Sequence, residues 1–410
     1  MDKPQTLKGF RDFLPEKMII RNEAIRRLRG IFEKYGFDEI QTPSLEYQEV
    51  LLGKYGEEAE KLMYLFKDPG QRNVGLRYDL TVPFARVAST YQDLPKPFKR
   101  YQIQPVWRAE NTQKGRYREF YQCDVDMVGT SSPLADAEII AVINDSLKAL
   151  GFSNFKIRVN SRAVLFSIME NAGIDKERWL TAIQSIDKLD KKTQEEVEQE
   201  LAQKGISTEQ TKSIFGNIKS ASPDEFLSKT IEYTKNMGAY ENVSFDPTLA
   251  RGLDYYTGPI FESVVEEPKI GSITGGGRYD NLLKTLGGPD LPATGTTIGL
   301  DRVVDVVDEL KLWSQEKTVT KVLVTVFNPE LLLQSIKIAS TLRGSGVNAE
   351  LYPDEAAKLE KQLKYANNKG IPFVVLIGPE EDAKNLVQLK DMASGKSENI
   401  TLEQLLKKIK

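Results

Sequence analysis

The stretch that decides the fold is residues 98–126, FKRYQIQPVWRAENTQKGRYREFYQCDVD. Large side chains alternate with polar ones over residues 101–107, a polar loop follows at 109–115, and the alternation returns at 117–128. A period of two is typical of strands with one buried face, and two such runs joined by a short polar segment predict a hairpin. The sequence therefore predicts a long antiparallel hairpin with a basic loop.

The polar side chains of this hairpin are expected on one face. Because side chains alternate between the two faces of a strand, Gln122, Asp124 and Asp126 share a face, and Arg108 projects opposite to Trp107. A guanidinium beside a row of polar groups can hold a phosphate and a small polar ligand. The alternative is a solvent-exposed sheet face with ordinary cross-strand ion pairs, which is the better interpretation of an arbitrary hairpin.

The composition restricts the chemistry. A chain of 410 residues is too long for one hydrophobic core, so two or three domains are expected. With 56 basic and 59 acidic residues the net charge is −3, so a nucleic acid would have to bind local basic patches. One cysteine, Cys123, and no histidine exclude a disulfide within the chain, a cysteine-built zinc site, and any catalytic or metal-bound histidine. Catalysis would depend on carboxylates, Arg, Lys, Tyr and backbone groups, as in phosphoryl or nucleotidyl transfer.

The sequence carries no membrane signal. Residues 1–11 are polar and lack the apolar core of a signal peptide. No apolar run reaches the ~20 residues that a membrane helix needs. We therefore expect a cytoplasmic protein with no membrane partner.

Helical patterns surround the hairpin. Pro15–Tyr35 predicts a helix that ends before Gly36, Phe37–Leu45 predicts a strand, and Ala135–Leu150 predicts an amphipathic helix. Between Arg162 and Met237, aromatic residues become rare and Lys, Glu and Gln more frequent, which indicates a helical insertion. Its predicted helices are Arg162–Asn171, Thr193–Lys204 and Asp224–Asn236.

The pattern of predicted strands and helices changes in the last part of the chain. Strand-like, glycine-rich sequence covers Phe245–Thr297, a helix is predicted at Leu300–Leu310, and a charged linker follows at Leu312–Thr320. Apolar strands then alternate with helices in the order βαβαβ, which predicts a separate C-terminal α/β domain. The strands are Val322–Phe327, Ala349–Tyr352 and Phe373–Ile377, and the helices are Leu331–Leu342 and Glu355–Asn368.

Further strings carry candidate site residues. Leu249–Gly258 reads LARGLDYYTG, and two tyrosines beside an Arg and an Asp are, taken alone, more often a packed corner than a site. Gly275–Asp280 reads GGGRYD; such a run often marks a loop, but it would also let a backbone approach a nucleotide or amino acid closely. No βαβ unit surrounds it, so it is no dinucleotide fingerprint. Thr294–Val303, TGTTIGLDRV, joins a strand to a helix, and a plain corner is the alternative there.

Together these strings resemble the class II aminoacyl-tRNA synthetases, and among them the histidyl-tRNA synthetases. The hairpin resembles class II motif 2, and its part GRYREFYQ is similar to the histidyl enzymes in particular. Leu249–Gly258 and Gly275–Asp280 resemble the two histidine signatures of that family, and Thr294–Val303 resembles motif 3. Gly36–Pro43 resembles motif 1, which builds the class II dimer interface. The resemblance covers nearly the full length, in the expected order.

The resemblance implies ATP and L-histidine as ligands and gives the candidate residues their roles. Arg108 would contact the α-phosphate of ATP, and Arg251 the same phosphate and the substrate carboxylate, so both are candidate catalytic residues. Arg302 would lie over adenine, a sound position for a guanidinium. The residues expected to bind histidine are Asp79, Thr81, Gln122, Asp126, Arg251, Tyr255, Tyr256 and Tyr279. Those expected to bind ATP are Arg108, Glu110, Arg116 and Arg302.

The chemistry of the residues agrees with these roles. An imidazole is recognised best by acceptors, for which Asp126 and Tyr256 are suited. A substrate carboxylate is already ionised at neutral pH, so its attack on ATP needs no general base. The attack does need cations, which Arg108, Arg251 and Mg²⁺ would supply. The Mg²⁺ is expected to be held mainly by ATP, with no His or Cys ligand.

The implied fold is α+β. A class II antiparallel-sheet catalytic domain (residues 1–160 and 240–318) would be interrupted by a helical insertion (161–239) and followed by a C-terminal α/β anticodon-binding domain (321–410). The implied function is that of a homodimeric histidine–tRNA ligase, which makes histidyl-adenylate and transfers histidine to the 3′ end of tRNA(His). One alternative is a catalytically silent paralogue that senses histidine or tRNA as a regulatory subunit. Another is a class II enzyme for proline, threonine or glycine. The intact Arg251 and the C-terminal domain argue against the first, and LARGLDYYTG argues against the second.

Overall fold

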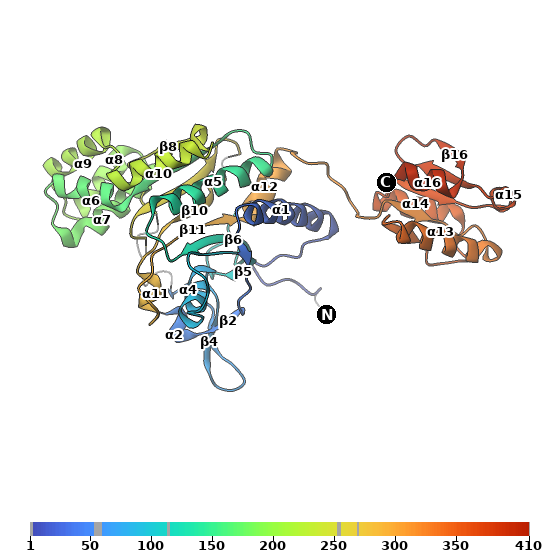
Figure 1. The fold of residues 1–410 in the computed structure, drawn as a ribbon, viewed down its shortest axis with the longest axis horizontal. Coiled ribbons are helices and arrows are strands. Elements are labelled where there is room, and N and C mark those ends of the chain that lie inside the picture. Colours follow the sequence, from blue (N-terminus) through green and yellow to red (C-terminus); the bar gives the residue numbers. More distant parts are fainter. Residues whose placement is uncertain (1–2, 53–59, 113–114, 252–255, 269, 410) are drawn as a thin grey trace. The chain divides into compact units, whose positions relative to one another are not determined.

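The computed structural model describes residues 3–52, 60–112, 115–251, 256–268 and 270–409 (Figure 1). The chain forms two compact units, Met1–Asp12 with Glu23–Leu312, and Phe13–Asn22 with Trp313–Lys410. Within the described ranges, no helix combines the length and the apolar character that crossing a membrane requires.

The larger unit is built on a sheet that contains eight strands among the described residues. Six neighbouring strands are antiparallel, and a short parallel strand pairs with each outer one. This confirms the predicted α+β class with an antiparallel sheet. The order across the sheet is β1 (Asp38–Glu39), β5 (Phe98–Trp107), β6 (Glu119–Val128), β11 (Ala293–Gly299), β10 (Ser272–Arg278), β9 (Pro259–Val265), β7 (Phe155–Ser161) and β8 (Val243–Phe245).

The predicted hairpin is confirmed as β5 and β6, paired from Phe98↔Val128 to Trp107↔Glu119. The predicted strand at Phe37–Leu45 is wrong, because only Asp38–Glu39 pairs with the sheet. Proline has no N–H to donate to a ladder, and the carbonyls of Thr42 and Pro43 accept hydrogen bonds from Arg77 instead.

Helices cover one face of this sheet. α5 (Pro133–Ala149) contacts β6, β7, β9, β10 and β11, and α10 (Glu225–Asn236) packs on α5 (Figure 1). Ser132 caps α5, and the proline at its first position favours helix initiation. α12 (Leu300–Glu309) packs on β6 and β11, and α1 (Pro15–Lys34) is the long N-terminal helix.

A group of helices stands between strands β7 and β8 in the chain. They are α6 (Arg162–Asn171), α7 (Trp179–Ile186), α8 (Gln194–Gln203) and α9 (Thr208–Ser220), with the 3₁₀ turns η1 (Lys176–Arg178) and η2 (Asp187–Asp190), and they precede α10. Their apolar core includes Leu165, Ile183 and Leu201 and continues into Leu249 and Ile260. α7 and α9 were not predicted, although Ser207 and Gln210 form a capping box at the start of α9.

A small sheet and short helices complete this unit. The sheet has the order β2 (Leu45–Tyr47), β4 (Asn73–Leu76) and β3 (Leu65–Lys67). The helices are α2 (Gln48–Leu51), α4 (Thr81–Thr90) and α11 (Leu282–Thr285), with the turn η3 (Tyr240–Asn242) before β8.

The second unit confirms the predicted βαβαβ order and extends it. The described strands have the order β13 (Ala349–Leu351), β12 (Val322–Val324), β14 (Phe373–Leu376), β15 (Val387–Asp391) and β16 (Ser397–Ile400). The first three are parallel, and the antiparallel β15 and β16 were not predicted. Val322 and Val324 belong to one apolar core and Leu323 to another, so both faces of this sheet are covered. The helices are α13 (Leu332–Gly344), α14 (Leu359–Lys369), α15 (Pro379–Ala383) and α16 (Leu402–Ile409), with the turn η4 (Pro329–Leu331).

Candidate active site

A pocket of about 470 Å³ lies on the sheet face that carries Gln122, Asp124 and Asp126. The structure brings together in it every predicted site residue that it describes. These are Asp79, Thr81, Arg108, Glu110, Arg116, Gln122, Asp126, Arg251, Tyr256, Tyr279 and Arg302. Tyr255, also predicted to bind histidine, lies outside the described residues.

One half of the pocket is acidic and buried. Asp124 and Asp126 on β6 are 2% and 3% exposed, and Arg100, paired with Asp126 on the neighbouring strand β5, is fully buried. Arg100 Nη2 lies 2.7 Å from Asp126 Oδ2 and 3.9 Å from Asp124 Oδ2. Burial raises the pKa of both carboxyls, that of Asp124 to about 7, although Arg100 opposes the rise. Tyr279 donates its hydroxyl hydrogen to Asp126 Oδ1 and so fixes the direction of that carboxylate.

Several polar atoms of the acidic half lack a partner. Among the described residues, Gln122 Oε1, Asp124 Oδ1 and Thr296 Oγ1 are buried and have no hydrogen-bond partner. Gln122 Nε2 donates to Thr297 Oγ1 at 3.0 Å, so its amide is held. Buried polar groups are normally paired, so these line a place for a ligand rich in N–H donors. Asp124 and Arg100 were absent from the predicted site residues, although the alternation of β6 put Asp124 on the same face.

The rim of the acidic half comes from two other segments. Asp79 Oδ1 accepts a hydrogen bond from the Val82 N–H at 3.1 Å, at the start of α4, and Thr81 is the first residue of that helix. Asp79 is therefore oriented by the helix terminus. The carbonyl of Tyr256 accepts a hydrogen bond from Arg162 Nε at 3.2 Å, which ties the chain at Tyr256 to α6.

The other half of the pocket is basic and more open. Arg108 Nε donates to the carbonyl of Tyr78 at 3.0 Å. The Arg108 guanidinium carbon lies 4.3 Å from the ring centre of Tyr78 and 5.2 Å from that of Phe120. These backbone and aromatic contacts, all between residues that the structure describes, orient the guanidinium and leave its charge available to an anion.

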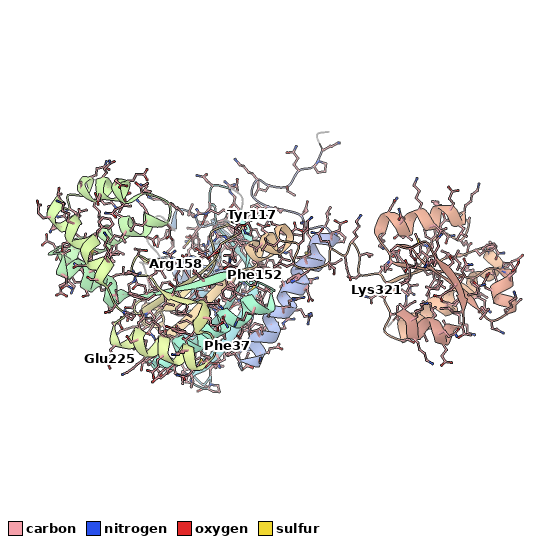
Figure 2. The ribbon with its side chains drawn as sticks, turned by 90° about the horizontal axis from the view of Figure 1, so that it is seen from above. Phe37, Tyr117, Phe152, Arg158, Glu225 and Lys321 are labelled. Carbon is pink, nitrogen blue, oxygen red and sulfur yellow. The ribbon has the colours of Figure 1, made fainter. Side chains whose placement is uncertain are left out.

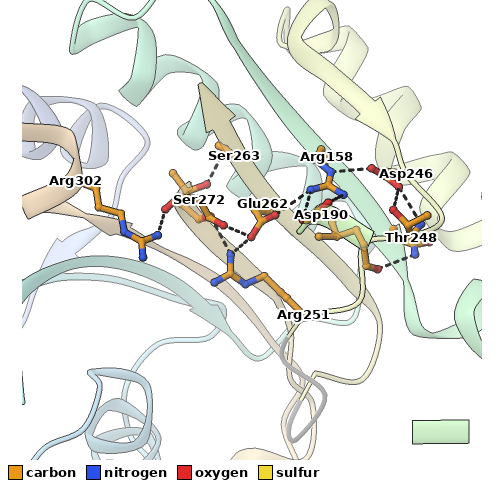
Figure 3. Close-up of polar contacts among 12 residues, drawn as sticks. Arg158, Asp190, Asp246, Thr248, Arg251, Glu262, Ser263, Ser272 and Arg302 are labelled. Carbon is orange, nitrogen blue, oxygen red and sulfur yellow. Dashed lines mark hydrogen bonds and ion pairs between the residues drawn. The ribbon is translucent and has the colours of Figure 1, made fainter. Parts of the chain in front are cut away.

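Arg251 lies flat against β10. Its Nη1 donates to Glu262 Oε1 at 2.5 Å and to the carbonyl of Thr274 at 3.3 Å (Figure 3). A Cβ at Gly275 would meet the Arg251 Cζ at 2.5 Å, so the glycine makes room for the guanidinium. Similarly, a Cβ at Gly295 would lie 1.9 Å from Asp126 Oδ1. These glycines lie in strands, as the strand-like pattern of Phe245–Thr297 predicted and unlike the loop that a glycine run often marks, and they leave room for the side chains of Arg251 and Asp126.

Arg302, in the first turn of α12, is held by carbonyls. Its Nη1 donates to the carbonyl of Ser272 (Figure 3), and its Nε donates to the carbonyl of Gly115 at 3.3 Å. Burial lowers the pKa of Arg302, and the nearby Arg251 adds to this. At the same end, Arg116 Nη1 lies 3.5 Å from Glu110 Oε2.

Two further residues near Arg302 were missed by the sequence reasoning. Asp301 accepts hydrogen bonds from the Tyr121 N–H at 3.0 Å and from Arg11. The Arg11 guanidinium lies 3.1 Å from the ring centre of Tyr117. Arg11 precedes Asp301 by 290 positions, so no local pattern indicated their contact.

Comparisons with known proteins agree with this geometry. The histidyl-tRNA synthetase family model matches residues 9–303, and an anticodon binding domain model matches residues 321–410. The chain is 41% identical to the histidine–tRNA ligase of Gloeobacter violaceus, over 97% of this chain and 96% of that protein. It is also 41% identical to the histidine–tRNA ligase of Aeropyrum pernix, over 99% and 98% of the two chains.

A solved structure is similar over the whole chain. The crystal structure of histidyl-tRNA synthetase from Nostoc sp. PCC 7120 matches with a TM-score of 0.88 at 30% identity, covering 100% of this chain and 99% of that one. The sequence matches and the fold thus point to one family across both units. The chain belongs to the histidyl-tRNA synthetase family.

Proposed function

We propose that this chain activates L-histidine with ATP and transfers it to the 3′ end of tRNA(His). The observation that carries the proposal is one pocket lined by Arg108, Arg251 and Asp126. The two guanidiniums suit a phosphate, and the buried carboxylate suits an imidazole. The sequence string at Leu249–Gly258 and the relatives of the family support histidine over other amino acids.

In the first step, a carboxylate oxygen of histidine attacks the α-phosphorus of ATP. The new oxygen–phosphorus bond forms as the bond to the β-phosphate oxygen breaks, which gives histidyl-adenylate and pyrophosphate. Charge builds up on the phosphorus oxygens, and Arg108 and Arg251 stabilise it there, while Arg302 lies against adenine and Glu110 and Arg116 contact the nucleotide. No proton has to be removed from the attacking group. In the second step, a ribose hydroxyl at the tRNA 3′ end attacks the acyl carbon. The ester bond forms as the bond between the acyl carbon and the phosphate oxygen breaks, AMP leaves, and the hydroxyl proton is released to solvent.

The acidic half of the pocket selects the amino acid. Asp126, oriented by Tyr279, and Tyr256 face the imidazole, while Gln122, Asp79 and Thr81 face the α-amino group. The unpaired buried acceptors Gln122 Oε1 and Asp124 Oδ1 support this assignment, since a ligand with N–H donors would satisfy them. An amino acid without such donors would leave them unpaired, and a site of this kind rejects it by a large factor.

Mg²⁺ is proposed as part of the substrate. In the described part of the chain, no group of three or more Asp, Glu or Cys residues is arranged to hold a metal ion. The ion would therefore arrive on the ATP phosphates and supply further positive charge to them.

The tRNA, the dimer and the compartment complete the proposal. Residues 321–410 bind the anticodon, residues 1–160 with 240–318 catalyse, and residues 161–239 form the insertion; the family-model match to residues 321–410 supports the first of these. The protein works in the cytoplasm as a homodimer. Exposed apolar side chains close to the segment that resembles motif 1 support a dimer face there; they are Leu45, Tyr47, Leu65, Phe66 and Tyr91.

The test is pyrophosphate exchange into ATP, run with each amino acid separately. Exchange that depends on histidine alone is the expected result. Exchange with another amino acid would overturn the specificity. Histidine binding without any exchange would identify a silent histidine-sensing paralogue instead.

A further inference from the structure

A polar row crosses the sheet from the helical insertion to the pocket. In the strand registers, Arg158 on β7 pairs with Glu262 on β9, and Glu262 pairs with Gly275 on β10. Because directly paired residues project from the same face, the three positions form one row. Gly275 has no side chain, and the Arg251 guanidinium occupies the space above it. Arg251 is therefore the continuation of this row into the pocket.

The outer end of the row is anchored on the insertion. Arg158 lies where the insertion meets the sheet (Figure 2), and its Nη1 and Nη2 donate to Asp190 at 2.8 and 2.9 Å (Figure 3). Asp190 is the last residue of η2, which follows α7 within the insertion. Arg158 Nε also donates to Asp246 at 2.7 Å. A two-bond Arg–carboxylate pair has a defined geometry, so the position of η2 fixes the Arg158 guanidinium.

Glu262 stands between the two arginines. Its Oε1 accepts from Arg251, and its Oε2 accepts from Arg158 Nη1 at 3.3 Å, the same Nη1 that bonds Asp190. Ser272 donates its hydroxyl hydrogen to Glu262 Oε1, and the Ser272 carbonyl accepts from Arg302. Glu262 is buried, so its charge is weakly screened and each arginine competes for it.

We propose that Asp190, Arg158 and Glu262 form a positioning network through which the helical insertion sets the orientation of Arg251. While Asp190 engages Arg158, Glu262 keeps its strong bond to Arg251. When Asp190 is removed or displaced, Arg158 turns to Glu262, and the Arg251 guanidinium loses the group that aims it at the phosphate. The network contacts no substrate and acts only through Arg251, so this inference rests on the role proposed for that residue.

The test is a double-mutant cycle with Asp190→Asn and Glu262→Gln, read as the single-turnover rate of adenylate formation. Asp190 is 46% exposed at its side chain, so its replacement should leave the fold intact. We expect Asp190→Asn to slow the step about fivefold, while the Kd for histidine stays unchanged. In the Glu262→Gln background, Asp190→Asn should have no further effect, because the connection is already broken.

Glu225→Gln is the matched control. Glu225 lies in α10 of the same insertion, where it is exposed and bonds Lys229, and among the described residues it has no contact with the row or with η2. Its replacement should leave the adenylate rate as it is. Equal slowing by Glu225→Gln would overturn the inference, as would independent effects that multiply in the double variant, or no effect of Asp190→Asn.

The proposed function is tested separately by Arg251→Ala. If Arg251→Ala slows the step and Asp190→Asn does not, only the network is refuted. If Arg251→Ala leaves the rate of adenylate formation unchanged, the role proposed for Arg251 in that step is refuted.

Discussion

The two halves of the pocket are built in different ways. In the acidic half, Asp124, Asp126 and Arg100 stand on neighbouring strands and are almost fully buried. In the basic half, Arg251 comes from a segment outside the strands, its side chain is 36% exposed, and among the described residues one carboxylate and one carbonyl accept hydrogen bonds from its guanidinium. The difference separates two tasks. A rigid, desolvated half can discriminate between amino acids, and an adjustable, positively charged half can follow a phosphate as its charge changes.

This division predicts that a substitution can impair the function of one half and leave that of the other unchanged. Substitutions in the basic half should affect the rate of the first step, and those in the acidic half should affect histidine affinity. The matched measurements are the single-turnover rate of adenylate formation and the Kd for histidine without ATP.

The largest effect is expected for Arg251→Ala. Loss of one preorganised charge at the phosphorus should slow adenylate formation by roughly 10²–10³-fold, while the Kd for histidine changes little. Arg251→Lys keeps the charge without the planar fork and should recover only part of the rate. Rapid chemical quench measures the rate, and equilibrium dialysis measures the Kd. An unchanged first-step rate would remove Arg251 from the mechanism.

Asp126→Asn should have the opposite signature. It removes the charge that faces the imidazole and leaves Arg100 less well paired, so histidine affinity should fall about 10–100-fold. The Kd for ATP should stay within about twofold, since it reports on the other half. Calorimetric titration with each ligand provides the comparison. Equal losses for histidine and ATP would contradict the assignment.

Substitution of two glycines tests the same contrast between rate and affinity without replacing a charged residue. Gly275→Ala places a Cβ where the Arg251 guanidinium now lies, and this flexible side chain can move aside, so the protein should fold and lose about tenfold in first-step rate. Gly295→Ala places its Cβ 1.9 Å from Asp126 Oδ1 and 2.7 Å from the backbone oxygen of Val125, so it should weaken histidine binding instead and should also lower the unfolding temperature. Thermal unfolding of both variants controls for stability. If both substitutions changed the first-step rate and the histidine affinity alike, the proposed distinction between the two halves would be contradicted.

The last prediction concerns the pH dependence of stability rather than activity. The folded-state pKa of Asp124 is raised to about 7, above that of an unfolded aspartate, so the fold favours its protonated form. The corresponding stability is fully present below about pH 4 and is lost as pH rises through the folded pKa. Between pH 5 and 8, the unfolding free energy of the ligand-free protein should fall by roughly 2–3 kcal/mol more than that of Asp124→Asn. Urea unfolding at each pH measures this, and parallel curves would refute the shift. No histidine in the chain titrates in this range.

Much of the fold could be predicted from the sequence where the pattern is local. The alternation in residues 98–128 specified β5 and β6, and with them the shared face of Gln122 and Asp126. The segment Val387–Asp391 was missed as a strand because three of its five residues are polar, and its pairing partners β14 and β16 decide its structure. Likewise, the short β1 owes its pairing to β5 rather than to its own two exposed acidic residues.

The candidate site, like the fold, has features that could be predicted from local sequence and features that could not. Strings around Arg108, Arg251 and Arg302 identified the residues, but not what holds them. Glu262 is 11 positions from Arg251, and Arg158 is 104 positions from Glu262, so their contacts arise only when β7, β9 and β10 pair. The space above Gly275 is equally a product of that pairing. Such features need the assembled sheet, because no spacing in the chain encodes them.

The central claim is that Arg108 and Arg251 act on one phosphate while Asp126 holds the imidazole. A crystal structure with a non-hydrolysable histidyl-adenylate analogue tests it most directly. The account predicts both guanidiniums in hydrogen-bond contact with the group that replaces the α-phosphate, and the Asp126 carboxylate against the imidazole. An analogue bound with either guanidinium turned away from that group, or with its imidazole outside the acidic half, would contradict it.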